Sequence, residues 1–177
     1  TRRAAHLRLT SKAVHSSTVP LIRKLALSDL CKSLTDKQVE EIFDLTEEKA
    51  VRKNHFVFKE GELADSLLVL VDGEVAVIKS ERLLAKLGTG AVLGEVSLFG
   101  VQHQRTASIR ALTDVHLLRI PSRTFRSLLT SENIAALKVV ANLAHQLCQR
   151  LLAANEQLIA AVTPSEKRDE EILGKSI

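Results

Sequence analysis

The spacing of apolar residues predicts three successive stretches, of which the first is helical. Val39, Ile42 and Phe43 recur three and four residues apart, the spacing that places side chains on one face of a helix. Thr35 or Asp36 can cap this helix, because both side chains accept hydrogen bonds from free backbone amides. The helices expected before about residue 48 span residues 4–16, 19–27 and 36–47.

The middle stretch has short apolar runs separated by glycine, which is typical of strands joined by turns. All but one of the seven glycines fall in it. Asp72-Gly73 lies between two of the runs, and this dipeptide is a strong signal for a β-hairpin turn. Short antiparallel strands at this spacing predict a β-sandwich, barrel or roll. The expected strands are at Val51 and residues 56–58, 67–71, 74–78, 83–87, 108–112 and 115–120.

After Pro121 the apolar spacing is helical again. Ser122 is placed to cap a short helix, a long helix is expected over about residues 132–161, and Pro164 ends the ordered region. We therefore expect an α+β fold, an antiparallel double-stranded β-helix or jelly roll (β-roll) flanked by N-terminal helices and a long C-terminal helix. The expected segments are an N-terminal helical segment (1–48), the β-roll core (49–121), a hinge helix with the long helix (122–163) and a flexible tail (164–177).

Composition limits the kinds of function that the chain can have. It has 177 residues, 45% of them hydrophobic and 26% charged, and its only aromatic residues are five phenylalanines. The core must therefore be aliphatic, and stacking on several aromatic rings cannot be the main mode of recognition. No apolar run approaches the roughly 20 residues that a membrane-spanning helix needs. Because the chain begins at Thr1 without a signal peptide, we expect a piece of a longer protein.

The net charge is +4, and basic residues are concentrated near the N-terminus. Residues 1–24 carry no acidic residue, and we expect a solvated segment or linker there rather than an arm that binds nucleic acid or a membrane. Cys31 and Cys148 are far apart in apolar helical contexts, so we expect two buried free thiols in a reducing compartment.

The segment from Gly94 to Ser108 carries the most informative chemistry. Gly94 permits a positive φ or a close backbone approach, and the residues after it can present successive N–H groups to an anion. Arg105 supplies a fixed, bidentate positive charge that suits a phosphate. Glu95 only accepts hydrogen bonds, so it suits the paired hydroxyl donors of a ribose. Together they describe a site for a nucleotide monophosphate, although such a pair alone is more often a surface ion pair.

These motifs resemble those of the cyclic nucleotide-binding domain family, whose phosphate-binding cassette reads Phe-Gly-Glu-x-[Ser/Ala]-Leu and, after a short loop, Arg-[Ser/Thr/Ala]-Ala. This chain matches the cassette at residues 93–98 and 105–107, with Leu93 where phenylalanine is usual. Further motifs occur in the family's order, and the resemblance covers about residues 36–160. They are residues 58–66 and 72–75, which resemble the first turns of the roll, and residues 114–120 with Phe125, which resemble its last strand and the following helix.

The resemblance implies roles for the matching residues, and the spacing of Glu95 and Arg105 is that of the family's bacterial catabolite activator branch. Glu95 would accept from the ribose 2′-hydroxyl, and Arg105 would pair with an equatorial phosphate oxygen. The long helix would close over the base, where Arg150 is the expected contact ahead of Gln149 and Asn155. The other ligand-binding residues implied, through backbone amides or a hydroxyl, are Gly94, Val96, Ser97, Thr106 and Ala107.

We therefore expect a regulatory domain that binds cAMP, with cGMP as the alternative, and that switches an effector by rearranging helices. Thr106 carries a hydroxyl, and the resemblance implies that a hydroxyl at this position is associated with tolerance of cGMP. The expected partner is an attached transporter, channel or enzyme domain, or a second copy joined through the long helix. The expected compartment is the cytoplasm, as a separate protein or as the cytosolic part of a membrane protein. DNA binding is not expected of these residues, because too few follow Ala161 for a helix-turn-helix.

Two alternatives stay open at this point. The chain can be the ligand-sensing part of a catabolite activator-type transcription regulator that lacks its helix-turn-helix, or a β-roll that binds proteins and no ligand. We expect neither an enzyme nor a metal ion. The six histidines are scattered, whereas a metal-dependent oxygenase needs a convergent set, and the chain has no nucleophile elbow.

Overall fold

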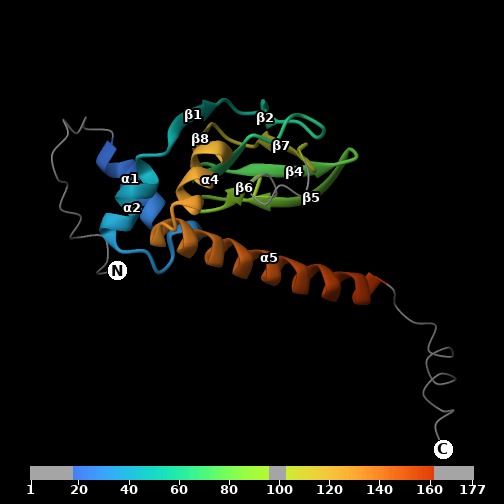
Figure 1. Ribbon diagram of the computed structural model, residues 1–177. Coiled ribbons are helices and arrows are strands. Elements are labelled where there is room, and N and C mark those ends of the chain that lie inside the picture. Colours follow the sequence, from blue (N-terminus) through green and yellow to red (C-terminus); the bar gives the residue numbers. More distant parts are fainter. Residues whose placement is uncertain (1–17, 96–102, 162–177) are drawn as a thin grey trace, which may run out of the picture. The chain divides into compact units, whose positions relative to one another are not determined.

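The computed structural model describes residues 18–95 and 103–161 (Figure 1). The chain divides into two compact units, Thr1–Leu143 and Ala144–Ile177. The first contains both sheets and the first turns of the long helix, and the second contains the rest of that helix. The expected helix over 4–16 and the expected tail over 164–177 lie outside the described residues.

Two antiparallel sheets of four strands form the core of the first unit (Figure 1). One has the strand order β1-β8-β3-β6 and the other β2-β7-β4-β5, so each sheet combines strands that are distant in sequence. The predicted α+β fold, a β-roll with flanking helices, is confirmed. The strands are β1 (Glu47–Val51), β2 (Phe56–Phe58), β3 (Ser66–Asp72), β4 (Val75–Lys79), β5 (Arg82–Leu87), β6 (Val92–Leu93), β7 (Ser108–Ala111) and β8 (Val115–Pro121).

The helices precede and follow the roll. Thr35 caps the helix that begins at residue 36: its hydroxyl accepts from the backbone N–H of Gln38, whose side chain accepts from the backbone N–H of Thr35. This helix ends before residue 47, earlier than predicted, because the chain turns at Asp44 and enters β1. The helices are α1 (Thr18–Ala26), η2 (Asp29–Cys31), α2 (Asp36–Phe43), α4 (Ser122–Thr130) and α5 (Ile134–Ala161).

Two buried apolar clusters stabilise the first unit, and β3 contributes to both because alternate side chains of a strand point to opposite faces. Leu67 and Val69 belong to the cluster that includes residues of the N-terminal helices, α4 and α5. Leu68 and Leu70 belong to the cluster between the two sheets. This double burial explains why the sequence of β3 is a continuous apolar run rather than an alternating one.

The predicted hairpin at Asp72-Gly73 is wrong. The flanking strands β3 and β4 belong to different sheets, so Gly73 carries the chain from one sheet to the other. Gly73 has φ +90°, and a Cβ there would lie 2.5 Å from the carbonyl oxygen of Asp114, so only glycine fits. A hairpin joins β4 to β5 instead through Ser80 and Glu81, both at positive φ. Its sequence lacks the glycine or asparagine that usually marks such a turn.

Two smaller predictions also differ from the structure. Ser122 is the first residue of α4 rather than its cap, because Pro121 takes the N-cap position and Ser122 is buried. Cys31 is buried as predicted, and burial raises the pKa of its thiol to about 12. Cys148, in contrast, is exposed, because the fully buried residues of α5 end at Leu143.

Polar side chains of α5 join its first turns to the N-terminal helical segment. The Asn142 side chain donates to the carbonyl oxygen of Leu30 at 2.9 Å. Lys138 donates to the carbonyl oxygen of Ser33 at 3.1 Å and to the side chain of Gln38 at 3.0 Å. The start of α5 and the residues around η2 are therefore connected by both apolar and polar contacts.

Candidate functional site

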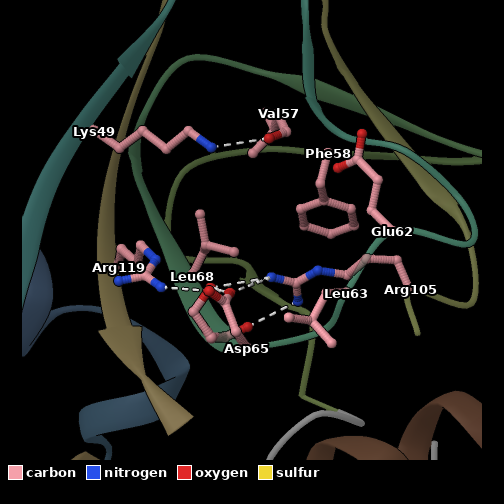
Figure 2. Close-up of a pocket in the computed structure, with 10 residues that line it drawn as sticks. Lys49, Val57, Phe58, Glu62, Leu63, Asp65, Leu68, Arg105 and Arg119 are labelled. Atoms are coloured by element: carbon pink, nitrogen blue, oxygen red, sulfur yellow. Dashed lines mark hydrogen bonds and ion pairs between the residues drawn. The ribbon is translucent and has the colours of Figure 1, made fainter. Parts of the chain in front are cut away.

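Arg105, on the segment that leads into β7, lies at the centre of the candidate site and is only 6% exposed. Its Nη1 donates to the carbonyl oxygen of Ser66 at 2.8 Å, and its Nη2 donates to the Ser66 hydroxyl at 3.0 Å. Nη2 also faces the carboxylate of Asp65 at 3.7 Å (Figure 2). Asp65 and Ser66, at the start of β3, therefore hold the guanidinium in place.

Two further residues, Phe58 and Gly94, pack against this guanidinium. The Cζ atom of Arg105 lies 4.1 Å from the centre of the Phe58 ring, a favourable cation–π distance. Gly94, at the end of β6, has φ +73°, and a Cβ at this position would overlap Nη1 of Arg105. A side chain at residue 94 would therefore displace the arginine, which gives the glycine of the motif a direct steric role.

The Nε atom of Arg105 is buried and has no acceptor among the described residues. A buried donor without a partner costs about 1–3 kcal/mol. The guanidinium thus keeps one directed donor for an acceptor that the described residues do not supply. Burial lowers the pKa of Arg105, while the charge of Asp65 opposes this decrease. An anionic oxygen at this position would satisfy the donor and offset the cost of the buried charge.

The guanidinium borders a cavity of about 270 Å³, near the lower end of the ~300–1,000 Å³ typical of ligand pockets (Figure 2). Lys49, Arg105 and Arg119 bring positive charge to its wall, and Glu62 and Asp65 bring negative charge. Its other lining residues are Val57, Phe58, Leu63, Ser66 and Leu68.

The charged groups of this cavity are coupled to one another. Asp65 accepts from Arg119 at 2.8 Å and from the Ser66 hydroxyl at 2.9 Å. Partial burial opposes its ionisation, but the Ser66 hydrogen bond and the charge of Arg119 lower the pKa of the Asp65 carboxyl. Burial, with the charges of Arg105 and Arg119, lowers the pKa of Lys49, which donates to the carbonyl oxygen of Val57 at 2.9 Å.

The structure brings part of the predicted site together. Gly94 is in direct contact with Arg105, and Glu95 is half-buried and close enough for its charge to stabilise the protonated guanidinium. Thr106 is exposed and Ala107 is half-buried. The other two predicted residues, Val96 and Ser97, lie outside the described residues.

The predicted base contact, Arg150, is exposed on α5 and belongs to the second unit. So do the two alternatives, Asn155 and Gln149, of which Gln149 contacts the ring of His145 at 3.1 Å. The contact of any of the three with a base stays a prediction.

Several residues around the Arg105 guanidinium carry no individual signal in the sequence. Phe58, Asp65 and Ser66 fall within the motif that resembles the first turns of the roll, but nothing in their spacing places them against Arg105. Arg119, which binds Asp65, has a clearer signal, because it is the charged residue in the otherwise apolar segment 117–121 of β8.

Residues 18–95 and 103–161 show neither a cluster of metal-binding side chains nor a membrane-spanning helix. No group of three or more His, Cys, Asp or Glu side chains in this part of the chain could hold a metal ion. None of its helices has the length and apolar character needed to cross a bilayer.

Comparison with known proteins identifies relatives of the roll. Residues 48–132 match the cyclic nucleotide-binding domain family. A cGMP-dependent protein kinase of Caenorhabditis elegans is 35% identical over 99 residues, which are 56% of this chain. The chain spans only 13% of the length of that kinase.

Two solved structures are also similar. A putative cyclic nucleotide-binding protein of Geobacter metallireducens has a TM-score of 0.63 and 28% identity, over 72% of this chain and 96% of that one. The catabolite activator protein of Thermus thermophilus has a TM-score of 0.67 and 27% identity, over 76% of this chain and 63% of that one.

Proposed function

Because residues 48–132 form a cyclic nucleotide-binding domain, we propose that this chain binds a purine 3′,5′-cyclic monophosphate with Arg105 as the partner of the phosphate. The observation that carries the proposal is the buried guanidinium: Ser66 holds its Nη atoms, and Nε has no acceptor among the described residues. The cyclic phosphate carries one negative charge on oxygens that accept hydrogen bonds. It would satisfy the remaining donor and neutralise a charge that is already desolvated.

Glu95 is the proposed acceptor for the ribose 2′-hydroxyl. It directly follows Gly94, whose backbone lies against Arg105, and its charge is close enough to stabilise the protonated guanidinium. A carboxylate offers no donor of its own and therefore favours a ligand with a free hydroxyl at this position. The sugar and the phosphate would thus be recognised by two side chains of opposite charge.

We propose cAMP as the ligand, and a specific observation keeps cGMP as the second candidate. Thr106 is exposed and directly follows Arg105, so its hydroxyl is not packed into the core. We propose that this hydroxyl would contact the 2-amino group of a guanine in the syn conformation. The similarity to a cGMP-dependent protein kinase supports the second candidate. Removal of the Thr106 hydroxyl should separate the two nucleotides.

We infer a regulatory rather than catalytic role, in which ligand binding rearranges the helices that flank the roll. Lys138 and Asn142 connect the start of α5 to the N-terminal helical segment, and these bonds would transmit a displacement of one to the other. The proposed recipient is an attached effector domain, with self-association through α5 as the alternative. A ligand shifts such an equilibrium only by its differential affinity, typically ~1–3 kcal/mol. Because cyclic nucleotides signal inside the cell, we expect the site to face the cytoplasm.

Isothermal titration of the folded chain with cAMP and cGMP tests the binding proposal, with 5′-AMP as a control for a noncyclic phosphate. We expect saturable binding of at least one cyclic nucleotide and much weaker binding of 5′-AMP. If neither cyclic nucleotide binds to the well-folded chain, the proposal fails and a protein-binding β-roll is favoured.

Hydrogen exchange with and without the nucleotide tests the output. We expect protection to change in α5 and in residues 19–47 as well as around the site. A change confined to residues 94–107 would contradict the helix rearrangement while leaving binding intact.

A further inference from the structure

Arg119 connects three strands beside the candidate site. It lies on β8, paired in register with Glu47 of β1 and with Leu68 of β3. One branch of its guanidinium donates to Glu47 at 2.7 Å, and the other donates to Asp65 at 2.8 Å. Its side chain is 25% exposed, so these charged hydrogen bonds are partly shielded from water.

The carboxylate of Asp65 lies between two arginines but is close to only one of them. Its Oδ2 accepts from Arg119 at 2.8 Å, whereas its Oδ1 stays 3.7 Å from Nη2 of Arg105 and accepts from the Ser66 hydroxyl (Figure 2). Arg119 therefore holds the carboxylate at a distance at which it balances the charge of Arg105 without a short ion pair. An Asp65 freed from Arg119 could close on Arg105 and compete with an incoming phosphate.

We propose that Arg119 is a positioning residue for the phosphate site, acting on Arg105 through Asp65. This inference rests on the proposed function, since the affinity that it controls is that for a cyclic nucleotide. Arginine suits the role because its planar fork reaches two carboxylates in different directions at once. Lysine would retain the charge but hold one carboxylate less rigidly, because its ammonium is a point donor on a flexible chain.

Titration calorimetry of cAMP and cGMP on Arg119→Ala and Arg119→Lys measures the effect. We expect Arg119→Ala to weaken binding about tenfold and Arg119→Lys to recover part of that loss. Arg110→Ala is the matched control, since Arg110 is an exposed arginine of β7 and should change affinity by less than about twofold. An Arg119→Ala affinity equal to that of the control would overturn the proposal.

Asp65→Asn separates positioning from a general structural role. If Arg119 acts through Asp65, adding Arg119→Ala to Asp65→Asn should change affinity by less than about twofold. A full-sized loss in that background would show that Arg119 acts by another route and would refute the inference. The same cycle with Arg119→Lys and Asp65→Asn serves if Arg119→Ala does not fold.

A measurement without ligand distinguishes failure of this inference from failure of the proposed function. The proton–nitrogen NMR signal of the Arg105 Nε–H, assigned by its loss in Arg105→Lys, should be sharp in the parent chain. In Arg119→Ala it should shift and exchange faster with water. An unchanged signal would overturn the positioning role, whether or not a nucleotide binds, whereas absent nucleotide binding with a changed signal would overturn only the proposed function.

Discussion

Arg105 and Arg110 lie close together in sequence, yet their surroundings in the roll differ. Arg105 is buried between Ser66, Phe58 and Gly94, and it borders a cavity of about 270 Å³. Arg110 is exposed on β7 and borders a larger and more apolar cavity of about 490 Å³ that also includes Phe56. Cavity volume alone would favour Arg110, whereas the proposed phosphate partner is Arg105.

The difference explains why we propose Arg105, rather than Arg110, as the anion site. At Arg105 the protein has already desolvated the charge, fixed two branches of the guanidinium and left Nε without an acceptor among the described residues. At Arg110 water still solvates the charge, so an anion gains little from replacing it. We therefore base the proposed site on the buried, directed donor rather than on cavity volume.

The largest expected effect comes from removing the two arginines in turn. Arg105→Ala should weaken cyclic nucleotide binding by about 2–5 kcal/mol, because a desolvated phosphate is left without its charge partner. Arg110→Ala should change the binding free energy by less than about 0.5 kcal/mol. Titration calorimetry on both variants checks the contrast. Equal effects would show that Arg105 is not the phosphate partner.

Gly94→Ala disturbs the packing around the Arg105 guanidinium without removing any charge. A Cβ at residue 94 overlaps Arg105, and the backbone has φ +73°, so we expect the free energy of unfolding to fall by about 1–3 kcal/mol and nucleotide affinity to fall with it. Urea unfolding and calorimetry measure the two effects. Gly88→Ala is the control, because a Cβ there meets nothing within 4 Å. Unchanged affinity in Gly94→Ala would contradict the tight seating of Arg105.

Glu95→Gln tests the sugar contact. A hydrogen bond to a charged acceptor contributes about 1.5–3 kcal/mol, so cAMP affinity should fall at least about tenfold. The parent chain and the variant should bind 2′-deoxy-cAMP with similar affinities, because that ligand lacks the hydroxyl. If Glu95→Gln weakens both ligands equally, Glu95 does not accept from the 2′-hydroxyl.

Thr106→Ala should have a smaller and selective effect. Loss of the hydroxyl should weaken cGMP binding by about 0.5–1.5 kcal/mol and leave cAMP binding nearly unchanged. Competition of the two nucleotides for one labelled ligand measures the ratio of their affinities. An unchanged ratio would remove Thr106 as the residue that discriminates between the bases.

The smallest expected effect is on stability in acid. The Ser66 hydrogen bond and the Arg119 charge outweigh the effect of partial burial and lower the pKa of Asp65. Such a group adds stability above its unfolded pKa of about 3.9, and this stability is lost as the pH falls through its folded pKa. Asp65→Asn should therefore flatten the decline in the free energy of unfolding below about pH 4. If the free energy of unfolding falls equally steeply with pH in the parent chain and in Asp65→Asn, the pairing of Asp65 with Arg119 and Ser66 is contradicted.

The sequence was sufficient to predict the fold where apolar periodicity is strong. The strands of the roll and the long α5 are confirmed, and so is the Thr35 cap, because each depends on residues close together in the chain. The prediction of a hairpin at Asp72-Gly73 was wrong because strand pairing is decided by contacts between residues distant in sequence. The short β6 was not predicted, because two residues carry no periodicity.

The candidate site was predictable only in its motif residues. Gly94, Glu95 and Arg105 stand out through their chemistry and their resemblance to a family. The partners of Arg105 are Asp65 and, at the start of β3, Ser66, and Asp65 is bound in turn by Arg119 of β8; all three lie outside the motif that contains Arg105. Their arrangement depends on how the strands pair, and no spacing rule contains that information.

The most direct measurement of the central claim follows the Nε–H signals of the arginines by NMR during titration with cAMP, and with cGMP in a parallel experiment. If Arg105 is the phosphate partner, its Nε–H signal should shift and exchange more slowly with water as binding saturates, while the Arg110 signal should not move. Saturating nucleotide binding without any change at Arg105 would contradict the claim that this donor receives the phosphate.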